Sequence, residues 1–241
     1  MLMKEIIFNN IFNLYTINIF TDASVYQCDN GKFVSCPGAI AIKVFDNIPY
    51  ICDKYCYLSY DSTNNEGEIK AIRAGIHLAQ KYRYSVPNIN LFSDSNICIS
   101  GLSEWMENWI KYSKNGVLYN SSNKEVINQE NFINVMYDIV SSKLNINLYH
   151  QKGHVKMNNK ESIEHARKVF KDINKLNPSY ELIKKISEYN NYVDVMTKQY
   201  IRHNLDMQKT NKDYKSIVRR EYPLTQEGLN EYKKYINFRR K

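Results

Sequence analysis

The chain has 241 residues, enough for one domain of about 150 residues with additions, and its 43% hydrophobic content indicates a globular protein. Its five cysteines form no C-x-x-C pair, which argues against a disulfide framework and a standard zinc module, although Cys28, Cys36, Cys52 and Cys56 stay open as a metal site of unusual spacing. The net charge is +8, no run reaches the ~18 apolar residues of a membrane span and no signal peptide is recognisable, so we expect a cytoplasmic protein without a membrane anchor.

The first predicted strand, Ile17–Ser24, alternates β-branched and aromatic residues with polar ones and reaches an acidic residue followed by small ones. Side chains alternate along a strand, so Phe20 and Asp22 share one face. Asp22 is expected at the carboxyl end of this strand, where ligands and catalytic groups gather in open α/β sheets. A single Asp in such a place is usually a turn former, so its interpretation depends on acidic residues further along the chain.

Two further strands are predicted at Ala39–Phe45 and Tyr50–Leu58, joined by a turn at Asp46–Pro49. We expect the first three strands to form an antiparallel meander. Residues 1–14, which precede them, hold several apolar side chains and are treated as an N-terminal extension, either a short amphipathic helix or an extra edge strand.

A helix is predicted from about Asn65 to Tyr82, with Asn64 as its N-cap, because capping residues precede a periodic apolar pattern. Glu68 lies near the start of this helix, in line with Ile72 on the apolar stripe. A carboxylate on a buried stripe is costly without a cation or hydrogen-bond donors. We therefore expect a positively charged partner for Glu68.

The fourth predicted strand, Ile89–Ser93, is followed at once by Asp94. The order strand, helix, strand predicts a crossover connection, so this strand should run parallel to the first. The carboxylates of Asp22 and Asp94 are then expected to lie side by side at one edge of the sheet.

The second half of the chain is predicted to contain a helix at about 128–143 and a fifth strand at Ile146–Tyr149. Two helices follow within residues 156–190, split at an Asn-Pro pair. A final helix is expected to begin at Asn191, with Asp194 in its first turn.

The end of the chain, from Asn204, is polar and charged and is expected to be a partly helical, mobile appendage. From Ile201 to Lys241 there are eleven Lys or Arg and five Asp or Glu, a balance of +6 that leaves +2 for the first 200 residues. Such a basic tail indicates an anionic partner such as nucleic acid, and a solvated charged helix is the alternative.

The order and spacing of five short motifs resemble the ribonuclease H family, bacterial or retroviral type 1. The motifs cover residues 15–155 and 191–200; each is weak alone, and together they are specific. The resemblance implies an α/β fold with a five-stranded mixed β-sheet flanked by helices on both faces. The motifs are Ile19–Ser24, Ser62–Ile69, Phe92–Ser95, Lys152–His154 and Asn191–Asp194.

Within this resemblance, Asp22, Glu68, Asp94 and Asp194 match the family's four catalytic carboxylates, which hold two Mg²⁺ or Mn²⁺ ions across the scissile phosphate. Four carboxylates in one crevice repel one another unless divalent cations neutralise them, and hard cations prefer oxygen ligands. Two ions about 3.5–4 Å apart would activate a water and stabilise the leaving oxygen. His154 matches the family's loop histidine, which is implied to move protons or to help the product leave.

The resemblance also implies contacts with substrate. Thr63 matches a position that touches a DNA phosphate, and the asparagines Asn64, Asn65 and Asn96 match positions in the minor groove, with N-capping as an alternative role for Asn64. The shallow minor groove of an RNA-containing duplex exposes 2′-hydroxyl groups that short amides can read. The implied activity is that of an endoribonuclease that hydrolyses the RNA strand of RNA/DNA hybrids, and we expect a monomer.

Several features depart from the family pattern, among them the longer loop Val25–Pro37 after the first strand, where the family has a Gly-rich turn. Glu66 lies close to Thr63, where its negative charge should weaken a phosphate contact. His154 and Asp194 lie forty residues apart, where the family has a short loop, so residues 155–190 are interpreted as a helical insertion. We divide the chain into an N-terminal extension (1–14), a ribonuclease H-like domain (15–203) and a basic C-terminal extension (204–241).

We hypothesise that the insertion and the basic extension grip the substrate. The loop Lys111–Lys124, which carries more Lys and Arg in relatives with a basic handle, is only mildly basic here. A stabilising addition to the fold is the alternative. The lysines of the insertion are Lys156, Lys160, Lys168, Lys171, Lys184 and Lys185.

Two other functions stay open. A structure-selective DNA nuclease of the same fold, of the resolvase or integrase type, is opposed by the Thr63–Glu68 pattern, which matches the hybrid-binding type. A non-catalytic nucleic-acid binding module is opposed by the presence of all four carboxylates, since an idle site would have little reason to keep a mutually repelling group. Cleavage of a labelled hybrid discriminates between these functions.

Overall fold

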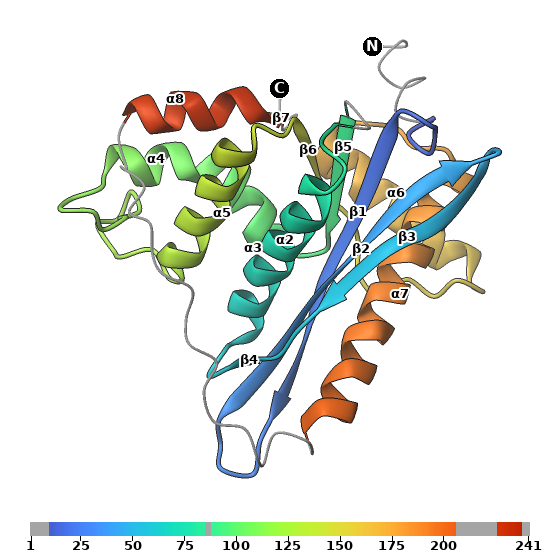
Figure 1. Ribbon diagram of the computed structural model, residues 1–241, viewed down its shortest axis with the longest axis horizontal. Helices are drawn as coiled ribbons and strands as arrows, with labels where there is room; N and C mark the ends of the chain where they lie inside the picture. Colours follow the sequence, from blue (N-terminus) through green and yellow to red (C-terminus); the bar gives the residue numbers. More distant parts are fainter. Residues whose placement is uncertain (1–9, 85–87, 206–225, 238–241) are drawn as a thin grey trace.

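A single mixed β-sheet with helices on both faces forms the centre of the protein, which we describe from a computed structural model (Figure 1). The described residues are 10–84, 88–205 and 226–237. The expected α/β fold with a five-stranded mixed sheet is confirmed, and two strands of two residues each are added to it.

The five longer strands are β1 (Thr16–Gln27), β2 (Phe33–Phe45), β3 (Ile48–Cys56), β5 (Asn88–Ser93) and β6 (Ile146–His150). The short strands β4 (Ser59–Tyr60) and β7 (Ile236–Asn237) pair with β2 and β6. Strands β1, β2 and β3 form the predicted antiparallel meander, and β5 lies parallel to β1 after the predicted crossover. The sheet order is β3-β2-β1-β5-β6-β7.

Helices cover the two faces unequally (Figure 1). One face carries α2 (Asn64–Gln80), α3 (Asn96–Ser100), α4 (Met106–Lys111), α5 (Gln129–Ser142) and α8 (Gln226–Tyr235), with a π-helical turn at Gly101–Trp105 between α3 and α4. The other face carries α6 (Lys160–Asn174) and α7 (Tyr180–Leu205).

The alternation of side chains along β1 separates the two larger of three core clusters, as the sequence pattern predicts. Ile17 and Ile19 pack with α2 and α5, whereas Phe20 packs on the opposite face with residues of α6 and α7. Phe20 stacks on Phe92 of β5, with 4.7 Å between the ring centroids. The burial of such side chains, each contributing about 1.5–3 kcal/mol, fixes both helical layers on the sheet.

Three asparagines form a ladder across the parallel strands. Asn90 Nδ2 donates to Asn18 Oδ1, and Asn147 Nδ2 donates to Asn90 Oδ1, each over 3.0 Å. Asn18, Asn90 and Asn147 occupy the same register position on β1, β5 and β6. Because Asp22 and Asp94 each follow a ladder residue by four positions, the same register brings these two acids level with each other.

The final helix differs from the prediction. The expected helix start at Asn191 is wrong, because α7 runs without a break from Tyr180 to Leu205 and places Asp194 in its middle. The pair Asn190 and Asn191 resembles a helix cap in the sequence. Both amides are held by tertiary contacts instead: Asn191 Nδ2 donates to the carbonyl of Val155 over 2.9 Å, and Asn190 is buried.

The segment interpreted as an insertion, 155–190, contributes to the second core cluster. Its buried residues Ile163, Phe170 and Ile186 pack in the same cluster as Phe20 of β1. This segment therefore covers one face of the sheet and is part of the core.

The last described residues, 226–237, differ from the expected appendage. Leu229 and Tyr232 of α8 are buried in the first core cluster, and the Tyr232 hydroxyl donates to the carbonyl of Leu102 over 2.8 Å. The rest of the basic extension, apart from Asn204 and Leu205, lies outside the described residues, as do residues 1–9 of the N-terminal extension.

All five cysteines are free thiols. Among the described residues, the metal-binding arrangement that forms is made of carboxylates and includes no cysteine, so the open possibility of a cysteine metal site is not realised. Within the same residues, no helix is long and apolar enough to cross a bilayer.

Candidate active site

The site forms where the parallel pairing of β1 and β5 ends. The last paired residues are Thr21 and Ser93, so Asp22 and Asp94 follow at the same level. The expectation that Asp22 ends its strand is wrong, because β1 continues to Gln27 while paired with β2 alone. This one-sided extension leaves room beside β1, and a cleft of about 620 Å³ opens there.

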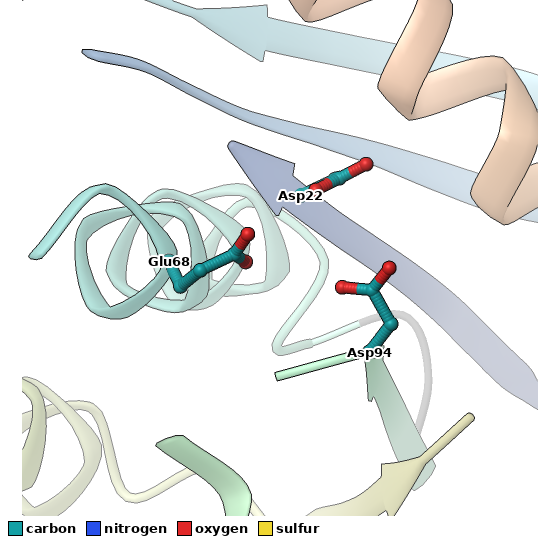
Figure 2. Close-up of side chains that lie close together, drawn as sticks. All are labelled: Asp22, Glu68 and Asp94. Carbon is teal, nitrogen blue, oxygen red and sulfur yellow. The ribbon is translucent and has the colours of Figure 1, made fainter. Parts of the chain in front are cut away.

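Three carboxylates converge in this cleft from three different elements (Figure 2). Asp22, Glu68 and Asp94 each offer an oxygen, and these atoms all lie within 4.8 Å of one another. Glu68 reaches the group because α2 lies very close to the sheet: a Cβ on Gly75 would come within 2.7 Å of Thr21. The predicted convergence of these three acids is confirmed.

Burial and mutual repulsion disfavour the charged forms of these acids. Burial, followed by the charges of Asp94 and Asp194, raises the pKa of Asp22 from 3.8 to about 8. Burial and the charges of Asp22 and Asp94 raise the pKa of Glu68 well above its ordinary value. Burial also raises the pKa of Asp94, against a hydrogen bond from Asn190 that lowers it.

The donor set fits a divalent cation. Among the described residues, no Lys, Arg or His forms an ion pair with Asp22, Glu68 or Asp94, and the buried Glu68 Oε2 has no hydrogen-bond partner. No side chain in the described part of the chain is therefore the positive partner expected for Glu68. An all-oxygen, multiply acidic group of this kind is what hard divalent cations bind.

The fourth predicted acid, Asp194, lines the same cleft from α7. Its Oδ2 lies 2.7 Å from Lys198 Nζ and 3.8 Å from His154 Nδ1. The charge of Asp194 raises the pKa of Asp22 and of Asp94. His154 stands on the loop after β6 with 76% of its side chain exposed.

A buried amide relay that the sequence did not reveal holds Asp94. Gln151 Nε2 donates to Asn190 Oδ1 over 2.5 Å, and Asn190 Nδ2 donates to Asp94 Oδ2 over 3.5 Å. Gln151 and Asn190 are each 1% exposed. The two residues lie far apart in the chain, and no pattern within either segment signals that they meet.

Gly153 permits the close approach of the histidine loop to Asp94. A Cβ at this position would lie 2.1 Å from Asp94 Oδ2, far inside contact distance. The Lys-Gly-His motif therefore has a steric reason for its glycine, in addition to the histidine that made it recognisable.

The four predicted substrate contacts, Thr63, Asn64, Asn65 and Asn96, are all exposed. Asn64 is the member of this group that lines the cleft itself. The predicted N-cap is wrong by one residue: Thr63 caps α2, because its hydroxyl accepts a hydrogen bond from the Glu66 amide over 3.4 Å. Lys70 Nζ lies 2.5 Å from Glu66 Oε1. This ion pair largely compensates the negative charge of Glu66, which was expected to weaken a phosphate contact at Thr63. Of the predicted substrate contacts, Asn65 is exposed at the start of α2 and Asn96 is exposed at the start of α3.

Solved structures with similar folds include ribonuclease H domains. The PFV ribonuclease H domain aligns at 17% identity over 65% of this chain and 92% of its own, with a TM-score of 0.48. The foamy viral protease-reverse transcriptase, solved with an RNA/DNA hybrid, aligns at 16% identity and a TM-score of 0.48 over 66% of this chain, which spans 20% of the viral chain. Ribonuclease H1 from Halobacterium salinarum aligns at 12% identity over 57% and 86% of the two chains, with a TM-score of 0.39.

A search of curated proteins finds no significant match. The family model described as RNase H matches residues 15–171, well over half of the sequence. The match contains Asp22, Glu68, Asp94 and His154, and it ends before Asp194. On this match, the chain belongs to the ribonuclease H family.

Proposed function

We propose that this protein is an endonuclease that hydrolyses the RNA strand of RNA/DNA hybrids with the help of two divalent metal ions, Mg²⁺ or Mn²⁺. The observation that carries the proposal is the convergence of Asp22, Glu68 and Asp94 within 4.8 Å in an open cleft of a ribonuclease H family protein. Burying several carboxylates close together lowers the stability of the folded state, and a bound cation would offset this loss.

In this proposal the ligands of the metal ions are Asp22, Glu68, Asp94 and Asp194. Bound divalent ions would supply an activated water and charge stabilisation at the phosphate. The protein's own part is to hold the four carboxylates in place, with Asn190 orienting Asp94. His154, exposed beside Asp194, would carry protons to or from the reacting oxygens, or help the product leave.

The substrate is assigned to the exposed residues at the start of α2. Thr63 would contact a phosphate, while Asn64, Asn65 and Asn96 would read the minor groove of the hybrid. The pairing of Glu66 with Lys70 supports a phosphate contact at Thr63, because it removes much of the local negative charge. We propose that the protein acts as a monomer.

The test is cleavage of a labelled RNA/DNA hybrid, compared with RNA/RNA, DNA/DNA and a four-way junction, with and without Mg²⁺ or Mn²⁺. Asp94→Asn should abolish cleavage. Asp172→Asn, the same change at an exposed position of α6 outside the cleft, is the matched control and should cleave like the wild type.

Each result separates the candidates. Metal-dependent cleavage of the hybrid alone supports the proposal. Cleavage of the junction instead would make the protein a DNA nuclease of the same fold, and hybrid binding without any cleavage would make it a binding module.

A further inference from the structure

Three charged residues form one row along α7, beginning at the active site. Asp194, Lys198 and Arg202 are spaced four residues apart, so their side chains lie on the same edge of the helix. All three line the cleft. Successive members of such a row are separated by about 6 Å along the axis, so Arg202 lies about 12 Å beyond Asp194.

The neighbouring row of α7 fixes the orientation of this edge. Thr197 and Ile201 are buried against the sheet, and the hydroxyls of Thr197 and Ser24 are 2.8 Å apart. A Cβ on Gly38 would lie 2.4 Å from Thr197 Cγ2, which shows how tightly the helix is seated on β2. Lys198 and Arg202 are exposed. The position of α7 therefore directs the charged row to the rim of the cleft.

The cleft continues past the carboxylates along the one-sided extension of β1. Its floor there is formed by Ser24, Val25 and Tyr26, and its wall by Ile201 and Arg202. The acidic lining residues gather at the other end, around Asp22. A polyanion that leaves the acidic centre in this direction meets a neutral floor and two positive side chains.

Lys198 stands between the two ends. Its ammonium lies 2.7 Å from Asp194 Oδ2, while 46% of its side chain remains exposed. A lysine has a long flexible stem and a compact charge, so it can exchange one anionic partner for another without moving the helix. Among the described residues, Arg202 has no acidic partner within ion-pair distance.

We propose that Lys198 and Arg202 form a phosphate-binding ridge for the nucleic-acid strand that extends from the active site over β1, and that Asp194 holds Lys198 until the carboxylates bind metal. This proposal rests on the proposed function, since it assigns a further contact to the same substrate. From Asp194 to Arg202 the charged row spans the axial length of roughly three to four nucleotides, at about 3.4 Å each.

The arrangement makes metal and nucleic acid interdependent through Lys198. When Asp194 becomes a metal ligand, the ammonium loses its partner and is available to a phosphate. Because coupling between two ligands is reciprocal, bound nucleic acid also draws Lys198 from Asp194 and strengthens metal binding. Arg202 has no such partner among the described residues, so we expect its contribution not to depend on metal.

The same geometry predicts effects of opposite sign for one substitution. In the absence of nucleic acid, Lys198→Gln removes a competitor for Asp194 and should tighten Mn²⁺ binding about two- to fivefold, a typical size for one nearby charge. In the presence of divalent cations, it should weaken hybrid binding, because a phosphate contact is lost. A residue that merely stabilises α7 would weaken both.

The experiment measures binding, so it does not depend on turnover. The wild type, Lys198→Gln and Arg202→Gln are titrated with a fluorescent RNA/DNA hybrid by anisotropy, in Ca²⁺ and in EDTA, with intact hybrid verified on a gel. Lys54→Gln and Arg83→Gln are the matched controls, since both residues are exposed and outside the cleft, Arg83 beyond the distal end of α2. Mn²⁺ affinity is measured separately by calorimetry.

In Ca²⁺, each ridge variant should bind several-fold more weakly and have a salt slope shallower by about 0.9, the value for one phosphate contact. In EDTA, Arg202→Gln should keep its effect while that of Lys198→Gln shrinks. Unchanged affinity and slope for both ridge variants would overturn the ridge. A Lys198→Gln effect equal in both conditions, with unchanged Mn²⁺ affinity, would overturn its retention by Asp194.

Parallel titrations with duplex DNA distinguish a failure of this proposal from a failure of the proposed function. If the wild type prefers DNA and the ridge variants weaken DNA binding, the ridge stands and the hybrid assignment fails. If the hybrid is bound and cut while the variants behave as the controls do, the function stands and the ridge fails.

Discussion

Asn190 Nδ2 donates a hydrogen bond to Asp94 Oδ2 from the same helix that carries Asp194, one turn further on. Helix α7 therefore supplies one acidic residue of the site and orients a second one, which directly follows β5. Gln151, buried at the end of β6, completes the relay by donating to Asn190 Oδ1. The geometry of the acidic cluster thus depends on how α7 is seated on the sheet.

Asn190→Ala is expected to weaken metal binding and cleavage about 10–100-fold, the usual effect of removing a hydrogen bond to a metal ligand. The loss has two causes: Asp94 is no longer oriented, and its pKa rises further because the bond that lowers it is gone. Calorimetric titration with Mn²⁺ and cleavage rates across Mg²⁺ concentrations measure the change. Higher Mg²⁺ should restore part of the rate.

Asn191→Ala is the matched control, since Asn191 is the next residue of α7 and its amide donates to the Val155 carbonyl away from the acids. It should change the melting temperature more than the metal affinity. Equal metal affinities for Asn190→Ala and the wild type would contradict the relay.

Gly153→Ala should reduce cleavage by about 100-fold or more, because the added methyl group would lie 2.1 Å from Asp94 Oδ2 and must displace either the loop or the carboxylate. Gly153→Ser should be at least as severe. Thermal melting beside the cleavage assay separates local from global damage, since the folded state should survive with a displaced loop. A wild-type cleavage rate in Gly153→Ala would show that the loop can move away from Asp94 without disturbing the site.

The level placement of Asp22 and Asp94 was predictable because a crossover fixes the direction of β5 and each acid comes at or near the end of a predicted strand. Glu68 was predictable because a carboxylate on an apolar helical stripe is conspicuous. Asp94 can be recognised as a candidate from the sequence of the strand before it alone. For these residues, local pattern and chain order contain the information that places them.

The relay and the ridge depend on information that no local pattern contains. Asn190 and Asn191 resemble a helix start, and only their contacts with Asp94 and Val155 show why the helix continues through them. A lysine four residues after an aspartate is an ordinary surface pair, so Lys198 was not distinguishable until α7 was placed beside the cleft.

Asn90→Ala should lower the free energy of unfolding by about 2–4 kcal/mol, because it leaves the buried Asn18 Oδ1 and the Asn147 amide without their ladder partner. Denaturant unfolding measures the loss. Asn88→Ala, at the exposed start of the same strand, should change stability by no more than about 0.5 kcal/mol. Similar stabilities for the two variants would remove the ladder as a determinant of strand register.

Asp22→Asn should abolish cleavage and yet stabilise the metal-free protein near pH 8. The folded pKa of Asp22 is about 8 against an ordinary value of 3.8, so between these values the folded state holds a proton that the unfolded state has released. Stability from this group is therefore complete below about pH 4 and is lost as the pH rises through 8. An asparagine has no charge to desolvate, so Asp22→Asn does not lose stability from this position as the pH rises.

Melting temperatures in EDTA from pH 5 to 8.5 test the sign. The wild type should lose stability relative to Asp22→Asn as the pH rises, with the variant ahead by about 1–2 kcal/mol at pH 8. Asp172→Asn should follow the wild type throughout. Saturating Mg²⁺ should stabilise the wild type more than Asp22→Asn, since the ion binds the deprotonated carboxylates of the folded state. A stability difference between the wild type and Asp22→Asn that stays constant from pH 5 to 8.5 would contradict this, because it would mean that Asp22 is already ionised in the folded state at pH 5.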